Sequence, residues 1–184
     1  MLVASDELLI EELFKHVQDY LIEKQSTWIQ QNFVPVLQSA FKLASCKKLQ
    51  DYCLESICKN PQQFVTSETF PLLDKEILFD LFKRDDFQVE EIVAWDSLIK
   101  WGIKQTPELE NKNDQNEWND KNYEDLKNTL SDFIPLIKFS KITSEDFHHK
   151  VRPYIPSNIY EEIMTYYLVE QPKLYKERAV YCNA

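Results

Sequence analysis

The stretch VEEIVAWDSLIKWG, residues 89–102, decides the class of fold. Its apolar side chains recur at intervals of three and four residues: Ile92, Trp95, Leu98 and Ile99. This spacing places them on one face of an α-helix. Gly102 follows, and we expect it to end the helix, because glycine adopts the left-handed cap conformation without strain.

The same periodicity extends in both directions from this segment. It predicts further helices, most of them short, over residues 10–21, 33–44, 46–59, 66–73, 75–84, 123–134 and 157–167. We expect Asn32, Asp74 and Ser157 to cap three of them. Residues 106–122 have no periodicity and are rich in asparagine and acids, which predicts a mobile loop. The predicted class is all-α, with roughly eight to ten short helices in stacked antiparallel hairpins and no sheet.

Composition excludes several classes of function. One glycine in 184 residues cannot supply a Rossmann or Walker phosphate loop. A net charge of −10 makes nucleic acid an improbable partner. No apolar run is long enough to span a membrane, and the N-terminus lacks the pattern of a signal peptide. We therefore expect a soluble, cytoplasmic protein, with a nuclear location left open and with reduced cysteines.

No pattern of residues predicts catalysis. His148 and His149 are adjacent, so on a helix they point about 100° apart and do not converge on one metal ion. Paired acids such as Glu11-Glu12 and Glu161-Glu162 are typical of helix N-termini and exposed surfaces. We expect no catalytic residue, no cofactor and no metal site, and hence no enzyme.

Several weak matches in a fixed order carry a family resemblance. They are LVASDEL at residues 2–8, ELFKHVQDYL at 12–21, NFVPVLQSA at 32–40, LQDYC at 49–53, SETF at 67–70, LIKF at 136–139 and SEDF at 144–147. The first two resemble the last helices of a BTB domain, and the rest resemble the BACK domain that follows it. The resemblance divides the chain into the end of a BTB domain (1–25), a BACK domain (26–168) and a flexible linker (169–184).

The resemblance also implies a function and a partner. Relatives of this kind are substrate adaptors of cullin-RING ubiquitin ligases, in which the end of the BTB domain and the first BACK hairpin, the three-box, form a groove for the cullin N-terminal domain. By order in the chain, the cullin-facing candidates are Tyr20, Gln25, Trp28, Asn32 and Phe33, with Val34, Leu37 and Phe41 as groove lining. Phe33, Leu37 and Phe41 equally fit a core stripe.

Two functions stay open at this point. The first is the adaptor, and the alternative is a structural helical spacer that positions a downstream domain, such as a Kelch propeller or a TLD domain, with no ligase role. The resemblance further implies a homodimer through upstream BTB residues in a full-length relative. We expect that adding such residues would raise the melting temperature, because the apolar patch of Leu2, Leu8, Leu9 and Leu13 would then be covered.

Overall fold

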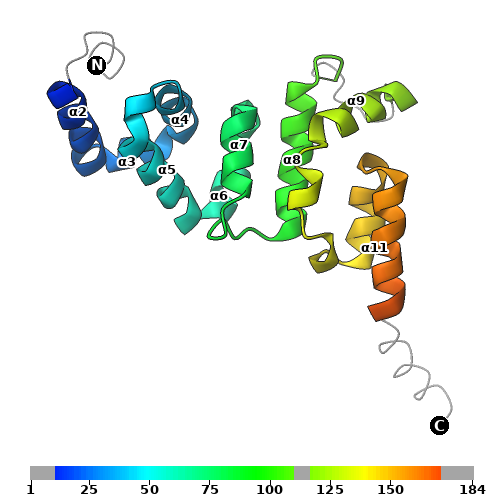
Figure 1. Cartoon of the computed structure of the whole chain (residues 1–184). Helices are drawn as coiled ribbons and strands as arrows, with labels where there is room; N and C mark the ends of the chain where they lie inside the picture. Colours follow the sequence, from blue (N-terminus) through cyan, green and yellow to red (C-terminus); the bar gives the residue numbers. More distant parts are fainter. Residues whose placement is uncertain (1–10, 110–116, 171–184) are drawn as a thin grey trace. The chain divides into compact units, whose positions relative to one another are not determined.

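Residues 11–109 and 117–170 are described by the structure, a computed structural model. Within them it contains ten α-helices, several single helical turns and no strand, which confirms the all-α prediction (Figure 1). The contacts separate the chain into two compact units, Met1–Glu90 and Glu91–Ala184. Each unit is taken by itself below.

The first unit is a succession of helices joined by turns of a few residues. In chain order these are α2 (Glu11–Lys24), α3 (Ser26–Gln31), α4 (Phe33–Phe41), the 3-10 turn η1 (Ala44–Cys46), α5 (Lys47–Lys59), α6 (Pro61–Val65), the 3-10 turn η2 (Phe70–Leu72) and α7 (Lys75–Phe82). Prolines occupy the first turns of α4 and α6, where the missing N–H costs no helical hydrogen bond. The predicted helices up to residue 84 are therefore present, with the 66–73 segment reduced to a 3-10 turn.

The core of this unit lies between α4, α5 and α7. Its fully buried members include Leu37, Ala40, Leu49, Cys53, Ile57, Leu78 and Leu81. An edge-to-face chain of rings links Phe33 to Phe64 (centroids 6.0 Å apart) and Phe64 to Phe70 (5.8 Å). Such ring pairs contribute about 0.5–1.5 kcal/mol beyond their buried area.

Two predicted caps in this unit are wrong. Asn32 and Asp74 do occupy the positions before α4 and α7, but neither side chain bonds to its helix. The Asn32 amide instead donates to the carbonyl of Trp28, and the Asp74 carboxylate accepts from the Gln38 amide. In both cases a neighbouring element offers the side chain a competing partner.

The second unit is built around α8 (Glu91–Gln105). α9 (Asp120–Leu130) packs on it. The elements that follow are the 3-10 turns η4 (Ile134–Leu136) and η5 (Phe139–Lys141), α10 (Ser144–Asp146), the π-helical turn η6 (Phe147–Val151), the 3-10 turn η7 (Arg152–Tyr154) and α11 (Ser157–Glu170). Trp95 and Trp101 of α8 are buried against Phe139 and Phe133, at 5.4 and 5.0 Å between ring centroids. Thr143 caps α10 by accepting from the backbone N–H of Asp146.

The predicted end of α8 is wrong. The helix continues past Gly102 to Gln105, and Gly102 is buried within it. A Cβ at Gly102 would lie 2.7 Å from Leu126 Cδ1 and 2.9 Å from Leu130 Cδ2 of α9. The glycine therefore permits the close approach of two helices and does not form a cap.

The predicted mobile loop lies partly outside the described residues, since 110–116 are not described. Its two ends are ordered: Leu109 and Trp118 are buried, and Asn119 and Asn122 form a reciprocal capping box that begins α9. α9 consequently begins earlier and ends earlier than the predicted 123–134.

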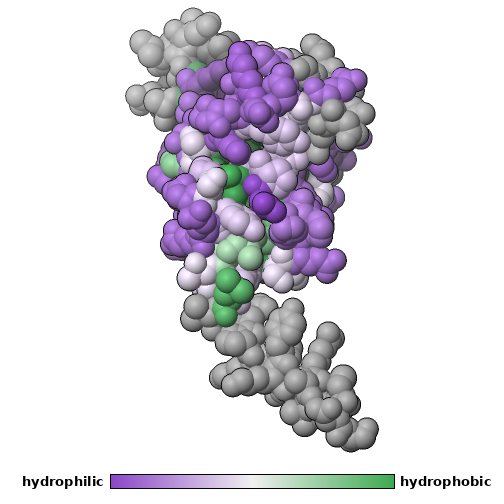
Figure 2. Space-filling model, turned by 90° about the vertical axis from the view of Figure 1, so that its right-hand side faces the viewer, coloured by the Kyte–Doolittle hydropathy of each residue, from purple (hydrophilic) through white to green (hydrophobic). Residues whose placement is uncertain are grey.

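One face of the molecule is mainly polar (Figure 2). On the face seen in Figure 2, hydrophilic side chains predominate and hydrophobic ones are confined to a narrow strip. Large apolar residues exposed on α11 are Tyr166 and Leu168. No described helix is long and apolar enough to cross a bilayer.

The predicted domain limits at 25 and 168 stay predictions. The structural division at residues 90 and 91 falls inside the expected 26–168 domain. Of the expected 169–184 linker, residues 171–184 lie outside the described part, and α11 runs to Glu170.

Candidate protein-interaction groove

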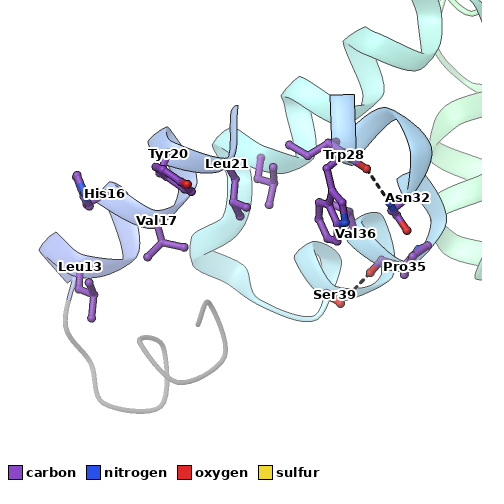
Figure 3. Close-up of a pocket in the computed structure, with 12 residues that line it drawn as sticks. Leu13, His16, Val17, Tyr20, Leu21, Trp28, Asn32, Pro35, Val36 and Ser39 are labelled. Atoms are coloured by element: carbon purple, nitrogen blue, oxygen red, sulfur yellow. Dashed lines mark hydrogen bonds between the residues drawn. The ribbon is translucent and has the colours of Figure 1, made fainter. Parts of the chain in front are cut away.

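An open groove of about 830 Å³ lies on the first unit, between α2 on one side and α3 and α4 on the other (Figure 3). Its lining is mostly apolar: Leu13, His16, Val17, Tyr20, Leu21, Trp28, Ile29, Asn32, Pro35, Val36, Ser39 and Leu49. This volume falls in the range that accommodates a few side chains of a partner.

Three of the large hydrophobic side chains that line the groove are exposed to solvent. Tyr20 is 51% exposed, Trp28 is 48% exposed and Leu13 is 40% exposed. All three line the same groove. Large aromatic side chains left half in water are typical of interface anchors, because a partner that covers them removes much apolar area from water.

Charge is absent from one side of the groove. Residues 25–41, which form α3, α4 and the positions beside them, contain no Asp, Glu, Lys or Arg, although 28% of the whole chain is charged. A partner that covers this stretch therefore removes no ionised side chain of these residues from water, and so avoids the cost of burying a charge.

Asn32 fixes the backbone beneath Trp28. It stands at the junction of α3 and α4, its backbone N–H donates to the carbonyl of Ile29, and its side-chain Nδ2 donates to the carbonyl of Trp28 at 2.8 Å (Figure 3). Two carbonyls at the end of α3 are thereby satisfied. The short helix that carries the indole is held by this residue.

Polar contacts also hold α2. Gln25 Nε2 donates to the Tyr20 hydroxyl oxygen at 3.3 Å. On the far side, Asp19 pairs with Lys48 of α5, which lowers the pKa of the Asp19 carboxyl below its usual value. Gln18 is buried and joins α2 to the start of α5.

Comparison with known families supplies the context of this groove. Residues 34–115 match the family model described as BACK, "BTB And C-terminal Kelch". The chain is similar to a BACK domain over these residues. This confirms the resemblance inferred from the sequence, and BACK domains are helical, non-catalytic interaction domains. Neither the curated proteins nor the solved structures gave a significant match.

The matched segment includes only the groove residues that lie on α4 and α5. It begins within α4, so α2 and α3, which carry Tyr20 and Trp28, precede the matched part of the BACK domain. It ends beyond α8 and so extends across the boundary between the two units.

The predicted partner-facing residues fall into two groups. Tyr20, Trp28 and Asn32 meet in the groove, and Gln25 contacts Tyr20. Val34 and Leu37 are buried in the core, while Phe33 and Phe41 are half-buried and do not line the groove.

Other groove residues were not predicted. Leu13, Val17 and Leu21 lie on α2, within the helix predicted over residues 10–21, and Pro35, Val36 and Ser39 lie on α4. The charge-free run at 25–41 is the sequence signal that could have directed attention to this surface.

Elsewhere in the described residues, few groups of side chains have potential for chemistry. No group of three or more His, Cys, Asp or Glu side chains in the described parts could hold a metal ion. Cys58 Sγ donates to Asp86, which also receives two hydrogen bonds from Arg84. Burial and the Asp86 carboxylate raise the pKa of the Cys58 thiol, so the thiolate, the reactive form, is disfavoured.

Proposed function

We propose that this chain is the substrate-adaptor segment of a cullin-RING ubiquitin ligase, and that the groove of α2, α3 and α4 receives the cullin N-terminal domain. One observation carries the proposal: Tyr20 and Trp28 stand half-exposed in a mostly apolar groove whose α3 and α4 side bears no charge. The BACK match supports an adaptor-like scaffold.

Such an adaptor acts by geometry. Binding would cover the exposed parts of Leu13, Tyr20 and Trp28, and the gain would come from removing their apolar surface from water. The helices would then fix the distance and angle between the cullin and a substrate held elsewhere in the assembly. No bond is made or broken by the segment itself.

The test measures affinity for a purified cullin N-terminal domain by calorimetry. Trp28→Ala removes the central anchor and should weaken Kd about 30-fold, the effect of losing a hot-spot side chain. Asn32→Ala frees the Trp28 carbonyl and loosens α3, so we expect a smaller loss of about fivefold.

Leu72→Ala provides the matched control. Leu72 is as exposed as Trp28, at 49%, but lies outside the groove, so its loss should leave Kd unchanged. Wild-type protein that binds no cullin would overturn the proposal and leave the helical spacer as the function to pursue. Equal losses for Trp28→Ala and Leu72→Ala would place the cullin on another surface.

A further inference from the structure

Gln18 is a polar residue that is buried in the first unit. It is 5% exposed and lies on α2. Its Nε2 donates to the carbonyl of Ser45 and its Oε1 accepts from the backbone N–H of Leu49, both at 3.2 Å. One side chain thus bonds two backbone groups that are 27 and 31 residues away.

The two backbone groups belong to the entrance of α5. Leu49 is in the first turn of α5 (Lys47–Lys59), where N–H groups have no acceptor within their own helix. No side chain caps α5 at its own N-cap residue, Cys46. Gln18 therefore provides from another helix an acceptor that the local sequence does not.

This pair of bonds constrains the orientation of α2. The amide donates at one atom and accepts at the other, so it satisfies Ser45 and Leu49 in one orientation only. A rotation or slide of α2 would leave buried polar groups without partners, which is costly. Val17 and Leu21 flank Gln18 on the same helix and line the groove, as does Leu49 itself.

We propose that Gln18 is a positioning residue that sets the groove by holding α2 in register with α5. The inference rests on the proposed function and extends it, because it names the contact that fixes α2, the helix that carries Tyr20. Its central claim concerns the geometry of the groove, so it can be tested in the absence of any partner.

Gln38 offers a matched control. It is also a glutamine with two long-range bonds, from Nε2 to the Leu72 carbonyl at 2.9 Å and to Asp74 Oδ1 at 3.0 Å. It lies on α4 but does not line the groove. Gln38→Met therefore removes the same kind of contact from the same unit without acting on α2.

The experiment labels the 184-residue chain with 5-fluorotryptophan and follows four resonances. Trp28 reports on the groove, while Trp95, Trp101 and Trp118 are buried in the second unit and serve as internal references. Trp28→Phe assigns the Trp28 signal. We expect Gln18→Met to displace that signal and weaken cullin affinity by about tenfold, whereas Gln38→Met changes neither.

Gln18→Asn is the second variant, for use if Gln18→Met does not fold. It keeps an amide but is one methylene too short to reach both Ser45 and Leu49, so it should displace the Trp28 signal in the same direction. An unchanged Trp28 signal in a folded Gln18 variant overturns the inference. Wild-type protein that fails to bind cullin overturns the proposed function alone. The fluorine signal of Trp28 is measured without cullin and therefore still tests the role of Gln18.

Discussion

Gly102 shows how one missing methyl group can determine a helix contact. The residue lies inside α8, where alanine would be the better helix former by about 1 kcal/mol. The space is taken by Leu126 and Leu130, which are fully buried and are therefore not free to move away. Packing at position 102 therefore favours glycine, whereas helix propensity favours alanine.

We predict that Gly102→Ala destabilises the protein by about 1 kcal/mol. Overpacking a tight core costs about 1–3 kcal/mol, which outweighs the gain in helix propensity. The free energy of unfolding, measured with urea, reports the change. In a Leu126→Ala background the same substitution should cost less or become stabilising, because the clash with Leu126 Cδ1 is gone. Equal costs in the two backgrounds would contradict the packing explanation.

The sequence could not separate the two uses of this glycine. A left-handed cap and a close helix contact both require a residue without Cβ, and Gly102 stands where either is plausible by spacing. The helix is instead ended three residues later, where the Thr106 hydroxyl donates to the Gly102 carbonyl at 2.8 Å. Which use applies depends on Leu126 and Leu130 of α9, which lie 24 and 28 residues farther along the chain.

At the scale of elements, periodicity predicted most of the helices and missed how they are joined. Most residues of the predicted stripes of α4, α5 and α7 are buried, because apolar spacing dictates which face turns inward. The large rings at their edges are only half-buried: Phe33, Phe41, Tyr52 and Phe82. Caps depend on which partner is nearest in space, and for Asn32 and Asp74 that partner comes from another element. The groove was only half predicted for the same reason, because its α2 side is defined by a contact with α5 through Gln18.

Docking of α11 provides a prediction at this scale. The buried Tyr167 hydroxyl lies 2.8 Å from the carbonyl oxygens of both Phe139 and Ile142, on and just after η5. Tyr167→Phe leaves these buried acceptors without this donor and should cost about 1–2 kcal/mol. Hydrogen exchange in α11 should accelerate, whereas exchange in α5 of the other unit should stay as it was.

The pH dependence gives a second test of this contact. Burial raises the pKa of Tyr167 above 10, so the folded state keeps the phenol protonated at a pH where the unfolded chain loses the proton. Stability from this group is complete below pH 10 and declines above it. The difference in free energy of unfolding between wild type and Tyr167→Phe should therefore shrink above pH 10. A difference that grows or stays constant would show that the hydroxyl is not buried as described.

At the scale of the whole molecule, the contacts divide the chain into two units, and each has a core of its own. Leu37, Leu49 and Ile57 are buried in the first unit, and Trp95, Trp101 and Phe133 in the second. The family match runs from α4 through α8 and so includes parts of both. The limits of the family match therefore differ from the boundary between the two units. An unfolding experiment tests whether the two units unfold separately or together.

We predict that the two units respond separately to a change in one core. Leu37→Ala should remove about 2–5 kcal/mol from the first unit, because it deletes a fully buried side chain and leaves a cavity. The fluorine signal of Trp28 should then lose its native position at lower temperature, while those of Trp95, Trp101 and Trp118 keep their wild-type midpoints. Each of these tryptophans lies within one unit, so each signal belongs to a single core. If all four midpoints fall together, the chain is one cooperative domain, and a defect anywhere in it would reach the groove.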